Sequence, residues 1–300
     1  MELFYNWWTN LYFLLLRPML KLLFKWVTGQ CELLRITYSN SHQADRVKRI
    51  ETSLRLSRNI ELQKCADNSD LDVTVSVERI QVVKNITPTA HPQFQVSFKD
   101  SLQRIAAYNQ IIVQAENLRK TKFSSDNEDH EEKLTKLWHL YNADGAVLPS
   151  RVGHHWTEIG FQGDDPATDF RGMGLLGLEQ LIFFAEIYPQ QALNVLSQSR
   201  HPQFGFSFAI VGINMTEMCV TLLNKRQFRS YIYSFEKPDP GLTDFHRIYC
   251  HIFHGFAQYW LAERPNSIME FGRVREDYLQ KVRTLLSADN TLLLSEFQQS

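Results

Sequence analysis

The sequence lacks the paired cysteines that hold zinc or form a redox-active disulfide. Its cysteines, Cys31, Cys65, Cys219 and Cys250, are widely separated, and no C-x-x-C pair occurs. The absence of such a pair excludes a zinc finger and a thioredoxin-type site. In a chain of 300 residues, scattered cysteines are typical of reduced, intracellular thiols rather than of a disulfide scaffold.

A strong excess of charge of either sign is also missing. The formal net charge is −1 at pH 7, whereas general nucleic-acid binding requires concentrated positive charge that displaces counterions. We therefore predict that the chain has no nucleic-acid partner. Apolar side chains make up 44% of the residues, which is enough to bury a substantial core in one large domain or in a domain with an extension.

Long uncharged runs are absent as well, even at the hydrophobic N-terminus. The longest run there begins at Leu3 and ends at Leu16, and Pro18 follows soon after it. A membrane-spanning helix needs about 20 nearly uncharged residues. A signal peptide would begin with basic residues, whereas this chain has Glu2 and carries its first basic residue at Arg17.

The basic residues of this N-terminal segment share one helical face. Arg17, Lys21 and Lys25 recur every four residues among leucines and aromatic residues, a pattern typical of a helix that lies in the membrane interface. We therefore predict a hydrophobic, amphipathic helix within residues 1–30 that contacts a membrane surface through residues 1–27. Two alternatives stay open, namely a helix packed against the protein's own core and a short spanning or targeting segment.

Alternating β-branched residues are scarce, and helical periodicity dominates the rest of the chain. Apolar residues recur at helical spacing in residues 44–68, 101–120, 134–141, 175–188, 206–224, 243–263 and 269–287. Residues 70–83 are ambiguous because their valines alternate as in a strand, although the neighbouring segments favour a helix. The polar run 120–133 indicates a linker or exposed loop, and the glycine-rich residues 143–174 indicate a loop. All-α is therefore the predicted fold class.

Two constellations that would indicate chemistry within the chain are incomplete. His246, Cys250 and His254 share a helical face, but no fourth zinc ligand is evident and the aromatic surroundings favour a buried structural face. We therefore predict no metal site. A nucleophile elbow of the form G-x-S-x-G is absent, which argues against a Ser-His-Asp hydrolase.

Gly172, Gly174 and Gly177 spell G-x-G-x-x-G, the spacing of a dinucleotide-binding turn. Such a turn must follow a buried strand, but the preceding residues are FQGDDPATDFR, whose aspartates would repel a pyrophosphate. The glycines instead flank Arg171 and allow another surface to approach it. Two interpretations of Arg171 follow: an arginine finger for transferring phosphoryl oxygens, or a structural ion pair with Asp165 or Asp169.

Around Arg171 the sequence strongly resembles the ELMO domain family. The family signature is matched by Trp156, Gly160-Phe161-Gln162, Pro166, Thr168-Asp169-Phe170-Arg171-Gly172, Gly174, Leu176-Gly177-Leu178 and Leu181. The resemblance implies an ELMO domain at about residues 130–290, after an N-terminal helical region at 31–125. The short chain, its hydrophobic N-terminus and GINMTE at 212–217 are similar to the ELMO-domain-containing proteins rather than to the larger ELMO scaffolds.

The resemblance also implies GTPase-activating activity toward Arf-family, especially Arf-like, small GTPases. Arg171 would be the catalytic arginine finger, supplied in trans, so that the chain is an enzyme activator rather than an enzyme with its own substrate. GTP and Mg²⁺ would belong to the partner, and no cofactor is expected on this chain. The supporting loop would comprise Trp156, Gly160, Phe161, Gln162, Asp165, Pro166, Thr168, Asp169, Phe170, Gly172 and Gly174.

Within this loop, Asp165 and Asp169 are expected to hold the backbone or orient Arg171, and Trp156 and Phe170 to pack beneath it. Gln162 is expected to make backbone bonds, with orientation of the attacking water as the alternative. The rival functional hypothesis is a non-catalytic effector or scaffold that binds a GTPase at a membrane. The resemblance further implies a cytoplasmic, peripheral membrane protein, because family members are associated with mitochondria, endoplasmic reticulum and lipid droplets.

Overall fold

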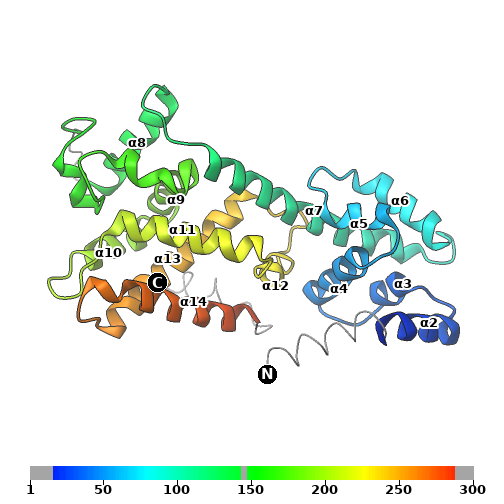
Figure 1. Cartoon of the computed structure of the whole chain (residues 1–300). Coiled ribbons are helices and arrows are strands. Elements are labelled where there is room, and N and C mark those ends of the chain that lie inside the picture. The colour runs from blue at the N-terminus through cyan, green and yellow to red at the C-terminus, as the bar shows by residue number, and fades with distance from the viewer. Residues whose placement is uncertain (1–15, 143–146, 288–300) are drawn as a thin grey trace. The chain divides into compact units, whose positions relative to one another are not determined.

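The structure, a computed structural model, describes residues 16–142 and 147–287 (Figure 1). These residues contain helices and connecting loops and no strand, which confirms the all-α prediction. They form two compact units. The N-terminal unit extends to Asn109 and also includes Ile232–Asp239, and the C-terminal unit contains Gln110–Tyr231 and the residues from Pro240 onward.

The N-terminal unit begins with a series of short helices. They are α2 (Arg17–Thr28), α3 (Glu32–Thr37), α4 (Gln43–Arg55), α5 (Ile60–Asp67) and α6 (Val73–Lys84), followed by the long helix α7 (Pro92–Lys120), within which the division between the units falls. α4 packs against both α3 and α5. Val47, Ile50 and Leu54 recur at helical spacing on α4 and are fully buried there, so the apolar stripe of the sequence forms the centre of this core.

Two stretches of this unit differ in detail from their sequence patterns. The predicted helical stretch 44–68 consists of two helices, because the chain turns after α4 and the side chain of Asn59 accepts a hydrogen bond from the Glu61 N–H at 2.9 Å, which starts α5. The ambiguous residues 70–83 form helix α6. Asp72 caps α6 by accepting a hydrogen bond from the Val75 N–H at 3.0 Å, which gives the alternating valines a helical start.

Helix α2 represents the described part of the predicted N-terminal segment, whose residues 1–15 lie outside the described residues. Its Lys21 forms an ion pair with Glu32 at 2.5 Å, and the Arg35 guanidinium lies over the Phe24 ring at 4.9 Å. Other apolar side chains of α2 remain in solvent, among them Met19 at 67% and Trp26 at 84% exposure. Within the described ranges, no helix has the length and apolar character needed to cross a membrane.

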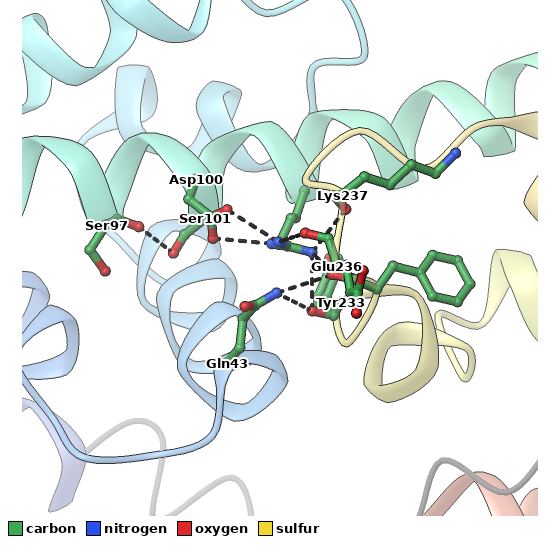
Figure 2. A network of polar contacts seen from close by, with 9 residues as sticks. Gln43, Ser97, Asp100, Ser101, Tyr233, Glu236 and Lys237 are labelled. Carbon is green, nitrogen blue, oxygen red and sulfur yellow. Dashed lines mark hydrogen bonds and ion pairs between the residues drawn. The ribbon is translucent and has the colours of Figure 1, made fainter.

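A segment without regular structure is held in the N-terminal unit by the buried side chain of Arg104 and the half-buried side chain of Gln43 (Figure 2). It comprises the residues that follow α12 (Arg229–Ile232), and its backbone carbonyls need donors because they make no helix or sheet bonds. Arg104 on α7 donates to the carbonyls of Tyr233, Phe235, Glu236 and Lys237, while Gln43 donates to Tyr233 at 3.0 Å. We call this arrangement the Arg104 network.

The C-terminal unit is built around one apolar helix, α9 (Gly174–Ile187). Helix α9 is contacted by α8 (Glu128–Tyr141), α10 (Pro189–Ser199), α11 (Phe208–Asn224) and α13 (Leu242–Glu263). Leu176, Leu178 and Phe184 lie on different sides of α9, and all three are fully buried. A helix that is apolar on all sides must be covered on all sides, so α9 forms the centre of this unit.

Several elements of this unit were not predicted from the sequence. Helix α10 begins at Pro189 directly after α9, and the glycine-rich stretch 143–174 contains two short 3₁₀ helices, η2 (His154–Ile159) and η3 (Pro166–Arg171). η4 (Ile268–Glu270) precedes α14 (Phe271–Ser287), and α14 falls within the predicted helical stretch 269–287. The loop that carries Arg171 is therefore more regular than its composition indicates.

Candidate functional site

Arg171 is the last residue of η3 and is exposed to solvent immediately before α9. Its Nε donates a hydrogen bond to the backbone carbonyl of Thr168 at 2.7 Å. No ion pair joins Arg171 to a carboxylate in residues 16–142 or 147–287. The structural alternative for Arg171, an ion pair with Asp165 or Asp169, is therefore not formed, and the two Nη groups of the guanidinium remain available at the surface.

The two candidate ion-pair partners of Arg171 are engaged in holding the loop. Asp165 is the N-cap of η3, and its carboxylate accepts a hydrogen bond from the Ala167 N–H at 3.0 Å. The carboxylate of Asp169 accepts one from the Gln162 N–H at 2.9 Å, which ties η3 to the preceding turn. Burial raises the pKa of the Asp169 carboxyl. The hydrogen bond from Gln162 and the positive charge of Arg171 both act to lower this pKa.

Aromatic side chains form the floor below η3. Phe170 is buried, and its ring packs edge-on against Phe161 at 5.7 Å and stacks on Phe123 at 6.1 Å. Trp156 is fully buried beside Phe161 and donates its Nε1–H to the carbonyl of Arg151 at 3.0 Å. Because Phe170 directly precedes Arg171 in the chain, this packing fixes the backbone from which the arginine projects.

Arg151 connects the loop to α8, and sequence reasoning missed it. Its guanidinium pairs with Glu131 of α8 and with Asp165, both at 2.7 Å, and it lies over the ring of Phe123 at 5.4 Å. The carboxylate of Asp165 thus receives one bond from Arg151 and one from the start of η3. Glu131, Arg151 and Asp165 are separated by long stretches of sequence and follow no shared spacing, so no local pattern could have grouped them.

The glycines of the loop have different roles. Gly174 is buried with φ +52°, and a Cβ there would lie 2.8 Å from the carbonyl oxygen of Leu118 and closer still to those of Arg119 and Thr121. Gly174 therefore allows α9 to start against the end of α7, where the Leu175 N–H donates to Thr121. Gly172 is exposed with open space around its Cα, and it is the glycine that leaves room beside Arg171.

Gly160 supports the loop from the other side. It has φ +84°, and a Cβ at this position would lie 2.8 Å from the backbone carbon of Ser207. Pro166 is buried at the first position of η3, whereas Gln162, in the preceding turn, and Thr168, within η3, are exposed. The structure thus brings the predicted loop residues together in one segment, in which Gln162, Thr168, Arg171 and Gly172 face solvent.

The histidines and cysteine of α13 do not form a metal-binding arrangement. His246 and Cys250 are buried, and the structure, over the residues that it describes, contains no cluster of three or more metal-ligating side chains. Burial lowers the pKa of His246 to about 4 and raises that of the Cys250 thiol. Both groups are therefore neutral near pH 7, and His246 packs against the ring of Phe183 at 5.2 Å.

Comparison with known proteins gives the class to which this fold and loop belong. Residues 113–275 match the model of the ELMO/CED-12 family, which is more than half of the chain. The chain belongs to this family. The matched region contains the whole loop from Arg151 to Gly174 and most of the C-terminal unit.

Individual relatives are similar over almost their whole length. ELMO domain-containing protein 2 of Bos taurus is 41% identical over 95% of this chain and 97% of its own. ELMO domain-containing protein 1 of Pongo abelii is 39% identical over 94% of this chain and 91% of its own. ELMO domain-containing protein B of Dictyostelium discoideum is 31% identical over 85% of this chain and 89% of its own. The N-terminal unit therefore accompanies the ELMO region in these relatives.

Proposed function

We propose that this chain is a GTPase-activating protein for Arf-family or Arf-like small GTPases and that Arg171 is the arginine finger that it supplies in trans. The observation that carries the proposal is an exposed guanidinium with free Nη groups on a rigid base. The nearby carboxylates of Asp165 and Asp169 are bonded instead to Arg151 and to the Gln162 N–H. A surface arginine kept clear of ion pairs in this way is suited to meet negative charge on another molecule.

The mechanism requires little movement of Arg171 itself. The partner contributes GTP, Mg²⁺ and the attacking water, and Arg171 approaches the γ-phosphate oxygens, where negative charge develops during transfer. The bond from Nε to the Thr168 carbonyl directs the side chain and leaves both Nη groups for the phosphate. Asp165 and Phe170 already fix the loop. The conformational entropy of the backbone that carries Arg171 is therefore lost on folding and not when the partner binds.

Gln162 and Gly172 complete the proposed contact surface. The backbone of Gln162 is bound to Asp169, while its side chain is exposed. We assign Gln162 a loop-holding role through this backbone bond, with orientation of the attacking water as the alternative. Gly172 leaves open space next to Arg171, so the surface of the GTPase can approach the backbone closely.

The test is single-turnover GTP hydrolysis by a panel of Arf-family and Arf-like proteins with wild-type chain and with Arg171→Lys. We expect the variant to lose roughly 10³–10⁵-fold of the stimulation, because an ammonium lacks the planar fork of the guanidinium. Arg200→Lys is the matched control, since Arg200 is also exposed and also donates to a backbone carbonyl, that of Glu158.

The same assay separates the proposal from the rival hypothesis of a non-catalytic effector or scaffold. An effector would bind the GTP-loaded partner without accelerating hydrolysis, and Arg171→Lys would then change neither measurement. If the folded Arg171→Lys variant binds and stimulates hydrolysis as well as wild type, the finger assignment is wrong. Loss of stimulation with binding retained would support a catalytic role for Arg171.

We further propose that the chain attaches peripherally to a membrane through α2. Met19, Leu23 and Trp26 are each more than half exposed on this helix, and apolar side chains of a basic amphipathic helix enter the boundary between headgroups and acyl chains. This attachment agrees with the cytoplasmic surface of mitochondria, endoplasmic reticulum or lipid droplets implied by the family resemblance. Met19→Ser with Trp26→Ser should reduce recovery of the full chain with phosphatidylcholine vesicles, and unchanged recovery would contradict the proposal.

A further inference from the structure

A groove of about 590 Å³ lies within the N-terminal unit and is not used in the proposed activation of a GTPase. It is bounded by one side of α2, the turn between α4 and α5, and the end of α6. Four basic side chains line it, namely Lys21, Lys25, Arg58 and Lys84. Apolar side chains, including Leu22, Leu56 and Val83, line it as well.

The groove carries an excess of positive charge. Glu32 is the acidic residue in its lining, and its carboxylate is neutralised by Lys21 at 2.5 Å and accepts a hydrogen bond from the Ser53 hydroxyl at 2.6 Å. Lys25, Arg58 and Lys84 form no ion pair with the described residues. Like charges gathered around a concavity raise the local concentration of an anion.

Helix dipoles do not account for this excess of charge. Four helix ends reach the groove, namely the N-termini of α3 and α5, at Cys31 and Asn59, and the C-termini of α4 and α6, at Leu56 and Asn85. Their partial charges have opposite signs and offset one another. The attraction for an anion therefore comes from the three unpaired side chains, which substitution can remove one by one.

The groove side and the exposed apolar side of helix α2 adjoin each other. Lys21 and Lys25 line the groove together with Leu22, which is 70% exposed, and Met19 and Trp26, which do not line it, are exposed at 67% and 84%. If the exposed apolar side enters a membrane, the basic groove lies beside the headgroups. We propose that the groove binds an anionic phospholipid of that membrane, with the headgroup phosphate between Lys25, Arg58 and Lys84 and the upper acyl chain against Leu22, Leu56 and Val83.

This inference rests on the proposed attachment through α2, and its test separates the two. The full chain is sedimented with vesicles of phosphatidylcholine alone and of phosphatidylcholine mixed with phosphatidylserine. We expect wild type to prefer the anionic vesicles. Lys25→Gln, Arg58→Gln and Lys84→Gln combined should weaken binding to the anionic vesicles by at least about tenfold and leave binding to phosphatidylcholine vesicles unchanged.

The matched control carries the same change of net charge outside the groove. Arg49, Lys99 and Lys225 also form no ion pair with the described residues and do not line the groove, and their combined substitution by glutamine should weaken binding to anionic vesicles much less. If the two triple variants lose binding equally, general surface charge explains the preference and the groove assignment is wrong. Retention of the preference by the groove variant would overturn the assignment as well.

A second measurement separates a lipid from a free phosphate. Calorimetric titration of the full chain with a short-chain phosphatidylserine, below its micelle-forming concentration, should show saturable binding that the groove variant loses. Inorganic phosphate should bind at least about tenfold more weakly, because it cannot cover the apolar lining; equal affinity would overturn the lipid assignment. Met19→Ser with Trp26→Ser should keep the short-chain lipid and lose the vesicles, so that failure of the attachment and failure of the groove give different results.

Discussion

Arg104 and Arg171 are the same side chain used in opposite ways in the two units. Arg104 is 2% exposed, and all three of its guanidinium nitrogens have partners, which are the Asp100 carboxylate and four backbone carbonyls. Arg171 is exposed, and among the described residues it has one hydrogen bond from its side chain, from Nε to the carbonyl of Thr168. Figure 2 shows that Gln43 meets the same segment, whereas Asp100 lies on α7 and pairs with Arg104.

The comparison shows that the number of guanidinium donors bonded within the protein separates a structural arginine from one suited to act on another molecule. A buried guanidinium must satisfy its donors inside the protein, or the cost of removing it from water is not recovered. An exposed guanidinium keeps water on its unused donors and can exchange that water for a phosphate. Arg104 should therefore dominate measurements of stability, and Arg171 measurements of activation.

Arg104→Met should lower stability most, because it removes the donor to the carbonyls of Tyr233, Phe235, Glu236 and Lys237. We expect a loss of about 3–5 kcal/mol in the free energy of unfolding, because a buried charge network is broken and its acceptors are left unsatisfied. Denaturant unfolding of the full chain measures it. Arg171→Ala, measured beside it, should change stability by no more than about 0.5 kcal/mol; equal losses would remove the distinction between the two arginines.

Helix α13 has two buried histidines, His246 and His251. His246 offers the next test, because its Nδ1 has no hydrogen-bond partner among the described residues, in contrast to the donors of Arg104. Burial lowers the pKa of His246 from 6.5 to about 4 in the folded chain, so the unfolded chain binds the extra proton between these values. Stability should be fully present above pH 6.5 and fall as the pH drops toward 4, by up to about 3 kcal/mol. His246→Leu should flatten unfolding curves measured across this range, and an unchanged pH dependence would contradict the assignment.

The two glycines next to Arg171 allow a smaller contrast inside the C-terminal unit. Gly174→Ala should cost about 2–3 kcal/mol, because a Cβ would meet the carbonyls at the end of α7 on a backbone with positive φ. Gly172→Leu should leave thermal unfolding unchanged and lower stimulated hydrolysis, since its side chain would stand where the partner approaches. A Gly172→Leu variant with full stimulation would show that the partner does not contact this side of Arg171.

The smallest expected effect concerns Arg151, which is intermediate between the two arginines of the comparison. It is half-buried and bound to Glu131 and Asp165, so Arg151→Gln should cost about 1 kcal/mol in stability. Stimulated hydrolysis should fall by about tenfold, less than for Arg171, because Arg151 only orients η3. A loss of stimulation as large as that of Arg171→Lys, with stability unchanged, would indicate instead that Arg151 itself contacts the nucleotide.

Much of the fold could be predicted from the sequence because helices are encoded locally. Val47, Ile50 and Leu54 recur at helical spacing and are the buried face of α4. The break after α4 was missed because it depends on a single cap, Asn59, within a stretch of continuous periodicity. Helix α10 was missed because it begins at a proline directly after α9 ends, where a sequence pattern predicts a loop as readily as a helix start.

The candidate site could be found in the sequence but not explained by it. The family signature identifies the segment around Arg171, and the local rules for proline and aspartate at a helix start agree with Asp165 and Pro166 at the beginning of η3. The sequence left two partners for Arg171 open, Asp165 and Asp169. Neither forms the ion pair. Asp165 pairs with Arg151 instead, and Asp169 accepts a hydrogen bond from the Gln162 N–H.

The helical class, the family and the arginine within the signature can all be predicted from the order of the amino acids. These follow from spacing within a few residues, which each segment of chain carries on its own. Three features depend on the tertiary fold: Arg171 has no ion pair with the described residues, Gly174 serves the contact with α7, and Lys25, Arg58 and Lys84 line one groove. The partners in each case come from distant segments, and the folded chain alone brings their charges and backbone carbonyls within reach.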